Sequence, residues 1–375
     1  MIRAVVMVAV LGVITPTWAE EDTSQIKTLT VEQAKAIVQR NRDEMLMLDG
    51  LSSLSDEVAS ALGQHEDFLS LNGLTMLSPE AAKVLTQHER ALQLNGLTTL
   101  SEEAAKALAK NRGLLTLDGL TTLSDKAAEA LAQHEGILHL NGLTTLSTRG
   151  AKALAKNRGL LSLGGLTTLS DKAAEALAQH EGHLWLDSLT KLSDGAAKEM
   201  GQREGELSLD RLTVLSDEAA KALAQRKGWL YLNGLTTLSD DAAEALGQHK
   251  DDLILNGLTM LSVKAAAALS QHDGRLDLNG LTELSPEVAE ALAKHKSLLS
   301  LDGLTTLSPE AAKAVAKHQG SLDLQGLTTL SDETAKALAQ HQGKGLDLSR
   351  LATLSDEAAK ALRANPMIHL PYKAP

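Results

Sequence analysis

The amino-acid sequence predicts an α/β solenoid in which each 23-residue coil contains one short parallel strand and one helix. The first observation is a repeat: the pattern Leu-x-Leu-(Asn/Asp)-Gly-Leu-Thr-x-Leu-Ser recurs every 23 residues from Leu46 to Leu322, with a fourteenth copy at Leu346. The second is periodicity, which changes within each copy from the alternation of a strand to the spacing of a helix. The third is composition: the 375 residues are 43% hydrophobic but only 2% aromatic, so the Leu and Ala of a short motif must supply the core.

The first 19 residues have the pattern of a secretory signal peptide. Arg3 gives a positive start, residues 4–14 form an apolar run, and small residues precede Ala19, where a signal peptidase would cut. The run is too short for a membrane span, and we expect the mature chain to begin at Glu20. The chain has no cysteine and therefore no disulfides, which fits a bacterial protein that is secreted, periplasmic or held at the cell surface.

The first half of each coil is predicted to be a strand followed by a turn. In the second copy Leu69 and Leu71 alternate with Ser70, so both leucines are expected in the core and the serine on the outside. Asn72 and Gly73 then turn the chain, because glycine adopts backbone conformations that other residues resist. Stacked coils would place these strands about 4.8 Å apart in one parallel sheet.

The second half of each coil is predicted to be a helix. Its start is marked by a serine, Ser78 in the second copy, which is repeated in all fourteen copies and suits a helix N-cap. Proline follows this serine at Pro79, Pro286 and Pro309, all at the first helical position, where proline is tolerated. Glycines such as Gly113 are expected to end the helix and return the chain to the next strand.

Both ends of the array carry sequences that would close it. Residues 20–45 are expected to form an N-terminal helical cap, because Thr30 and Gln33 have the spacing of a capping box. Residues 46–363 would form the solenoid of fourteen copies. Residues 364–375 are the expected C-terminal cap, in which Ile368 starts a last strand and Pro371 prevents further pairing.

Residues 46–363 resemble the leucine-rich repeats, in the form found in secreted bacterial proteins with 23-residue repeats. The resemblance lies in the layout Leu-x-Leu-x-x-Leu-x-x-Leu followed by a helix, and it implies a right-handed solenoid. Two details differ from the usual family pattern. Leu51 and Leu74 stand where the family has asparagine, and the polar positions fall two residues earlier, as at Asp49 and Asn72. The resemblance implies a non-catalytic scaffold that binds proteins through the exposed face of its sheet.

The candidate binding site comes from positions at which the copies differ. Trp185, Trp229 and Tyr231 fall at outward-facing strand positions of three adjacent coils, although the chain has few aromatic residues. Exposed aromatic side chains ringed by charges are typical of binding surfaces. The alternative is structural, with the rings packed on one another across neighbouring strands. The candidate ligand-binding residues are His183, Trp185, Glu206, Trp229, Tyr231, Asp252, Ile254, Arg275 and Asp277.

A second histidine-rich pattern suggests a metal site but is better explained by structure. Nine histidines share one register: His65, His88, His134, His180, His249, His272, His295, His318 and His341. We expect them in the last helical turn, where histidine bonds free carbonyl groups and complements the helix dipole. Asn111, Asn157, Arg203 and Arg226 occupy the same register in other copies, as a ligand position would not allow. The sequence therefore predicts no metal and no cofactor.

Enzymatic activity is not expected. The repeated serines are accounted for by capping, and none belongs to a recognisable catalytic triad. Glu206 and Asp252 would lie two strands apart, roughly 9.6 Å, at the wide limit for a pair of glycosidase carboxylates.

The charge balance limits the partners. With 36 basic and 48 acidic residues, the formal charge of −12 disfavours nucleic acid and an anionic membrane. No segment after the signal peptide is apolar enough to span a membrane. A protein is the expected partner and a saccharide the next choice, because aromatic rings stack on sugars. The competing hypothesis is a structural spacer of the cell envelope that has no specific ligand.

Overall fold

A computed structural model describes residues 23–42, 44–86 and 90–371 of the chain. The predicted signal peptide, residues 1–19, lies outside the described residues, as does the predicted first residue of the mature protein, Glu20. The described part begins with a short 3-10 helix, η1 (Thr23–Gln25), which is followed by the first α-helix. Among the described residues, no helix is both long and apolar enough to cross a membrane.

The repeat forms a regular series of strands, each two or three residues long. The strands are β1 (Leu46–Met47), β2 (Leu69–Ser70), β3 (Leu92–Gln93), β4 (Leu114–Thr116), β5 (Ile137–His139), β6 (Leu161–Ser162), β7 (Leu184–Trp185), β8 (Leu207–Ser208), β9 (Leu230–Tyr231), β10 (Leu253–Ile254), β11 (Leu276–Asp277), β12 (Leu299–Ser300), β13 (Ser321–Asp323), β14 (Gly345–Asp347) and β15 (Ile368–His369).

A helix of about two turns follows each of the first fourteen strands, and a longer helix precedes them. The helices are α1 (Val31–Arg40), α2 (Asp56–Leu62), α3 (Pro79–Leu85), α4 (Glu102–Leu108), α5 (Asp125–Leu131), α6 (Thr148–Leu154), α7 (Asp171–Leu177), α8 (Asp194–Met200), α9 (Asp217–Leu223), α10 (Asp240–Leu246), α11 (Val263–Leu269), α12 (Pro286–Leu292), α13 (Pro309–Val315), α14 (Asp332–Leu338) and α15 (Asp356–Arg363). Below, a coil takes the number of its strand, so coil 7 contains β7 and α8.

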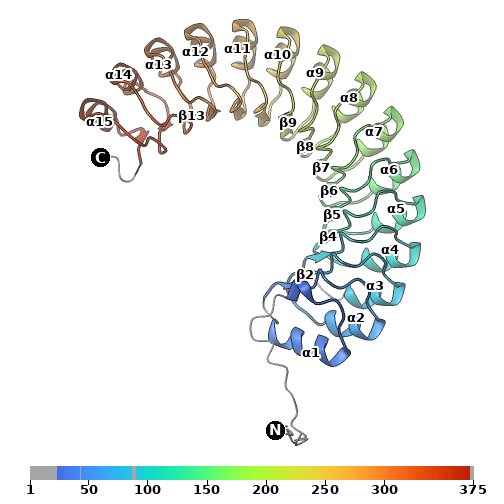
Figure 1. Ribbon diagram of the computed structural model, residues 1–375. Helices are drawn as coiled ribbons and strands as arrows, with labels where there is room; N and C mark the ends of the chain where they lie inside the picture. The colour runs from blue at the N-terminus through green and yellow to red at the C-terminus, as the bar shows by residue number, and fades with distance from the viewer. Residues whose placement is uncertain (1–22, 43, 87–89, 372–375) are drawn as a thin grey trace, which may run out of the picture.

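The coils stack into an arc with the strands on the inner, concave side and the helices on the outer, convex side (Figure 1). The strands form one parallel sheet in the order β1 to β15, and each strand is hydrogen-bonded to the strand before it and the strand after it in the sequence. The register advances by one repeat at each step, so that Leu69 pairs with Leu92 and Ser70 with Gln93. Helices α1 and α15 lie at opposite ends of the arc (Figure 1). The predicted α/β solenoid is confirmed.

The core is a continuous column of Leu and Ala between the sheet and the helices. In coil 2 the side chains of Leu69, Leu71, Leu74, Ala81 and Ala82 have no exposed surface, and the same positions are buried in the other coils. Burying one leucine contributes roughly 1.5–3 kcal/mol, but a single coil has no second layer against which to bury it. Stacking supplies that layer, and the small alanines let the helices lie close to the sheet.

The predicted helix starts are confirmed, and the serines also link the coils. The hydroxyl of Ser78 accepts a hydrogen bond from the backbone N–H of Ala81, and Pro79 occupies the first turn. The same hydroxyl donates to Oδ1 of Asp56, the first residue of the preceding helix, over 2.5 Å. Equivalent bonds join other pairs of coils, as from Ser147 to Asp125. Serine is therefore repeated both as a cap and as a contact between neighbouring helices.

A ladder of side-chain to backbone hydrogen bonds runs along the turn that follows the strands. The backbone N–H of Asn95 donates to Oδ1 of Asn72 over 2.9 Å, and that of Asp118 donates to Oδ1 of Asn95 over 3.0 Å. Each polar side chain thus satisfies a backbone group one coil further along. This ladder lies at the position that the sequence marks, two residues before the usual asparagine of leucine-rich repeats.

Two sequence-based predictions about the helix ends are wrong. Helix α4 ends at Leu108, so Gly113 lies five residues beyond it and does not end it. A Cβ atom on Gly113 would lie 1.8 Å from the carbonyl oxygen of Arg90, so glycine is needed there because backbones of adjacent coils approach closely. The histidines are also outside the helix: α2 ends at Leu62, and His65 follows three residues later with 1% of its surface exposed.

The buried histidines hold the chain as it turns from helix to strand. The ring Nε2–H of His65 donates to the carbonyl oxygen of Phe68 over 3.2 Å, and His134 bonds Ile137 in the same way. Burial lowers the pKa of His134, which favours the neutral ring. The predicted bonding to carbonyl groups is confirmed, but a charged ring facing the helix dipole is not what the structure contains. His88 lies outside the described residues.

The two ends of the array have the predicted local structure. The Oγ1 of Thr30 accepts from the N–H of Gln33, and the Gln33 side chain accepts from the N–H of Thr30, which completes a capping box at the start of α1. Helix α1 packs against α2. At the other end β15 pairs with β14, through Ile368 opposite Leu346.

Candidate functional site

The sheet brings the predicted aromatic and charged residues together on strands β7 to β11. Two outward-facing rows carry them. The outer row consists of the residue that directly precedes the first leucine of the Leu-x-Leu strand in each coil. In coils 7 to 9 these residues are His183, Glu206 and Trp229. The inner row consists of the residue that directly follows the same leucine in each coil, and it includes Trp185 and Tyr231. These five residues are called the aromatic patch below.

Polar contacts connect three strands of the aromatic patch. The Nδ1 of His183 lies 3.0 Å from Oε2 of Glu206 on the next strand. Glu206 in turn faces Tyr231 on β9. Burial, the charge of Glu206 and a hydrogen bond with it raise the pKa of Tyr231 to about 12. The phenol is therefore protonated at neutral pH and is fixed in place by the carboxylate.

The two tryptophans differ in exposure. Trp229 is 50% exposed, and its ring centroid lies 6.4 Å from that of Tyr231 at an interplanar angle of 52°. Trp185 is half-buried, and its ring lies 6.1 Å from that of His139, two strands away. The indole N–H of Trp185 is buried and has no hydrogen-bond partner among the described residues. Trp229 is thus the open ring of the aromatic patch, and Trp185 is partly covered.

His139, which contacts Trp185, is not among the residues predicted from the sequence. Its place in the inner row, two copies before Trp185, was the available clue. The contact is possible because Ser162 stands between the two rings on β6 and is itself buried. Ser162 donates to Oδ1 of Asn141 over 2.6 Å, and Ser208 makes the equivalent bond to Asp187. From β5 to β9 serine alternates with larger side chains along this row, which leaves room for the rings on the concave face.

The remaining predicted residues lie beside the aromatic patch, with two of them buried. Arg275 binds both carboxylate oxygens of Asp277, with Nε 2.6 Å from Oδ1 and Nη2 2.9 Å from Oδ2. Asp252 accepts a hydrogen bond from the backbone N–H of Arg275 over 3.1 Å. Asp277 and Ile254 are only 5% and 6% exposed. Strand alternation predicts that outward-facing residues are open, and this prediction is wrong for both, because their neighbours on the concave face cover them.

Two buried arginines hold the backbone beneath the aromatic patch. Arg203 and Arg226 replace the turn histidine, and each donates to the carbonyl oxygen of an outer-row residue: Arg203 Nη1 to Glu206 over 2.9 Å and Arg226 Nη1 to Trp229 over 2.7 Å. Each also reaches the preceding coil, Arg203 through the carbonyl of Gly182 and Arg226 through that of Gly205. Burial lowers the pKa of these guanidinium groups to about 10 and about 9, which leaves both charged at neutral pH.

The backbone is unusual at the same place. Gly205 and Gly228 have φ values of 87° and 97°, and among the described residues they are the glycines with a positive φ. Ser188 and Arg211 also replace the glycine of the turn after the strand in coils 7 and 8. The aromatic patch therefore coincides with a local departure from the repeat in both backbone and sequence.

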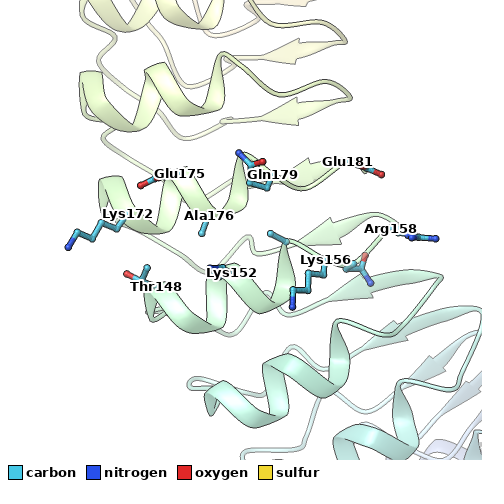
Figure 2. Close-up of a pocket in the computed structure, with 11 residues that line it drawn as sticks. Thr148, Lys152, Lys156, Arg158, Lys172, Glu175, Ala176, Gln179 and Glu181 are labelled. Atoms are coloured by element: carbon cyan, nitrogen blue, oxygen red, sulfur yellow. The ribbon is translucent and has the colours of Figure 1, made fainter.

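The convex side carries grooves between helices that the sequence analysis did not predict. The groove between α6 and α7 has a volume of about 660 Å³ and is lined by Lys152, Lys156, Arg158, Glu175 and Glu181, among others (Figure 2). Lys156 and Arg158 point in different directions and do not converge on one point (Figure 2). The groove is open and the five named side chains are exposed, which makes it a weaker candidate than the concave face.

Metal-binding residues are not assembled in the described part of the chain. It contains no group of three or more His, Asp or Glu side chains placed to hold one ion. The rings of His249, His272 and His295 stack with centroids 6.0 and 6.1 Å apart and interplanar angles of 4° and 3°. Stacked rings whose nitrogens bond backbone carbonyls, as His272 Nδ1 does with His249 over 2.7 Å, support the turns.

The fold is that of the leucine-rich-repeat proteins. The solved structure of the Toll–Spätzle complex of Drosophila contains a chain that is 15% identical, with a TM-score of 0.50; the match covers 92% of this chain and 53% of that one. The present chain thus spans about half the length of that protein. A leucine-rich-repeat protein of Leptospira interrogans is 18% identical with a TM-score of 0.44, covering 93% of this chain and 100% of the other. An internalin of Listeria monocytogenes is 14% identical with a TM-score of 0.43, covering 94% and 97%. No family model and no curated protein match the sequence.

Proposed function

We propose that this protein is a secreted, non-catalytic recognition scaffold that binds a protein partner through its concave sheet face. The aromatic patch is the proposed anchor, with Asp252, Ile254, Arg275 and Asp277 beside it. The observation that carries the proposal is the open ring of Trp229, half exposed in a solenoid whose other coils place few rings on the surface. Exposed tryptophan and tyrosine are typical of the residues that dominate binding energy at protein interfaces.

The surroundings of Trp229 support recognition rather than accidental exposure. Arg226 fixes the carbonyl group of Trp229, and Tyr231 holds the ring from one side. Glu206 is in turn fixed by His183 and by Arg203. Side chains that are held before a partner arrives lose less conformational entropy on binding. A spacer with no ligand would need the backbone bonds of Arg203 and Arg226, which replace those of the turn histidines, but not the side-chain contacts that join His183, Glu206 and Tyr231.

The proposal can be tested without knowing the natural partner. A phage-displayed library of random 18-residue peptides is selected on the protein, and the enriched peptides are measured on three proteins: the wild type, Trp185→Ala/Trp229→Ala, and Val214→Ser. Val214 is 70% exposed and lies outside the strands, so it controls for the loss of an apolar surface residue. We expect enriched peptides to lose about tenfold or more in affinity for the double variant and to keep their affinity for the control.

Two results would contradict the proposal. Enrichment no greater than on an unrelated immobilised protein would favour a structural spacer. Peptides that bind the double variant as well as the wild type would show that the aromatic patch is not the anchor. A glycan array run in parallel distinguishes a saccharide ligand, whose binding would be lost in the double variant while no peptide is enriched.

A further inference from the structure

The outer row of coils 1 to 6 is entirely apolar. Its members on six consecutive strands are Met45, Phe68, Ala91, Leu114, Ile137 and Leu160. Met45 and Ile137 are 68% and 41% exposed, and the others are half-buried. Adjacent members lie side by side, as Leu114 pairs directly with Ile137 in the parallel register. Neither the outer nor the inner row carries an Asp, Glu, Lys or Arg in these six coils. This stretch is called the apolar row below.

The same two rows become acidic from coil 7 onward. They carry five carboxylates and one guanidinium there, a formal charge of −4 (1 − 5). The five are Glu206, Asp252, Asp277, Asp323 and Asp347, and the guanidinium is that of Arg275. Asp277, Asp323 and Asp347, all in coils 11 to 14, are called the acidic end. The concave face is thus divided along the arc, with the aromatic patch between the apolar row and the acidic end.

The acidic end is incompletely neutralised by the protein itself. Asp323 and Asp347 face each other across the register of β13 and β14. Burial and the charges of Asp302, Asp347 and Asp277 raise the pKa of Asp323, and Arg275 opposes this effect. Arg275 is already engaged in two hydrogen bonds with Asp277. A cationic group from a partner would therefore relieve a repulsion that exists in the free protein.

We propose that the partner is a protein segment that lies along the arc, across the strands, with apolar side chains over coils 1 to 6 and lysine or arginine side chains over coils 11 to 14. This inference rests on the proposed function and specifies its partner. Charge complementarity sets the polarity of the segment, because the concave rows are uncharged at one end and acidic at the other. Burial of apolar side chains against the apolar row contributes to affinity. Charge attraction at the acidic end orients the segment and makes the affinity depend on salt.

The length of such a segment follows from the strand spacing. From β2 to β14 there are twelve steps of about 4.8 Å, or roughly 58 Å along the sheet. An extended chain covers about 3.3 Å per residue, so a segment of roughly 18 residues reaches both ends. A peptide that contacts only Trp229 could be much shorter. A peptide of this length can be synthesised, so binding at both ends can be tested.

The test uses labelled 18-residue peptides and fluorescence anisotropy. The matched peptide has one half of alternating Leu and Ser and one half of alternating Lys and Ser, and it is made in both chain directions. One comparison peptide has Glu in place of Lys, and another has Asn in place of Leu. We expect one direction of the matched peptide to bind about tenfold or more tightly than either comparison peptide, and to weaken as salt is raised.

Protein variants locate the two contacts. Asp323→Asn/Asp347→Asn should weaken the Lys-containing peptide several-fold, whereas Glu310→Gln/Glu333→Gln, which removes the same charge from exposed positions on α13 and α14, should not. Ile137→Ser should weaken binding of the Leu-containing half, with Val214→Ser as its control. Circular dichroism confirms that each variant is folded.

The results separate this inference from the proposed function. If library peptides depend on the aromatic patch but are acidic or unaffected by Asp323→Asn/Asp347→Asn, the proposed function stands and the two-ended partner is wrong. If the Glu peptide binds as tightly as the Lys peptide, the inferred polarity is also overturned. If no library peptide depends on Trp185 and Trp229 while the matched synthetic peptide binds as predicted, the face is a binding surface whose anchor lies elsewhere.

Discussion

Coils 9 to 12 and coils 7 to 8 form the turn from helix to strand in two different ways. In the first region neutral histidines stack, as His295 and His318 do with centroids 6.0 Å apart, and each is linked to nearby carbonyl groups. In the second, the charged guanidinium groups of Arg203 and Arg226 replace the neutral rings, and Gly205 and Gly228 beside them have positive φ. The buried strand leucines are unchanged in both. The comparison shows that the apolar core fixes the stacking, while the polar turn residues determine how each outer-row residue is held.

Mild acid should produce the largest effect, through the histidine region. Burial lowers the pKa of seven turn histidines: His134, His180, His249, His272, His295, His318 and His341. The unfolded chain therefore binds more protons than the folded one once the pH falls below the ordinary histidine value of about 6.5. The free energy of unfolding keeps its full value above pH 6.5. As the pH falls below 6.5, it decreases by up to roughly 1.4 kcal/mol per pH unit for each histidine that stays neutral in the folded protein.

Urea unfolding at pH 7.5, 6.5 and 5.5 measures this loss. His272→Asn introduces the residue found at Asn111 and Asn157, so it should reduce the slope below pH 6.5 without introducing a new charge. An unfolding free energy that does not change between pH 7.5 and 5.5 would contradict the account of the ladder as neutral and buried.

The next largest effect is expected from the arginine region. Arg226→Ala leaves the carbonyl groups of Gly205, Gly228 and Trp229 without their guanidinium donor, at a cost of about 3 kcal/mol in unfolding free energy. Arg226→His restores the residue of the regular coils and should recover part of it. Urea unfolding at pH 7.5 measures both, with the exposed Arg211→Ala as a control. Equal stability of the Arg226→Ala and Arg211→Ala variants would show that the arginine turn is not structural.

Removing the hydrogen bond of Ser162, which lies between the rings of His139 and Trp185, should have a smaller effect on stability. Ser162→Ala loses the hydrogen bond to Asn141, which costs about 1 kcal/mol. Ser162→Leu should cost more, because the added side chain enters the space between His139 and Trp185. Thermal unfolding monitored by circular dichroism compares the two variants. A leucine variant more stable than the alanine variant would contradict the crowding explanation for the alternating row.

The smallest change in stability is expected at the aromatic patch itself. Trp229→Phe keeps an aromatic ring on an exposed position and should alter the unfolding free energy by less than about 0.5 kcal/mol. In the mature chain from Glu20, which lacks Trp18, it should nevertheless remove most of the acrylamide-quenchable, red-shifted tryptophan emission, because Trp229 is half exposed and Trp185 is partly covered. Trp185→Phe is the matched variant and should leave the quenchable component in place. Loss of the quenchable emission in Trp185→Phe and not in Trp229→Phe would show that Trp185, rather than Trp229, is the exposed ring.

Much of the candidate site followed from the sequence because strand alternation fixes which side chains face outward. That rule placed Trp185, Trp229 and Tyr231 on one face, and the contacts of Glu206 with its neighbours agree with it. The rule does not give exposure, which depends on the size of side chains on adjacent strands. For this reason it failed at Ile254 and Asp277 and did not reveal His139.

The sequence by itself determined the coil, its period, its helix starts and its apolar column, because these depend on alternation, capping and repetition within 23 residues. Only the tertiary structure decided what the turn residues do. The histidines are buried and the glycine at Gly113 is required because backbones of neighbouring coils meet there, 23 residues apart in the chain. The aromatic patch is held in place in the same way, by arginines that reach from one coil to the next.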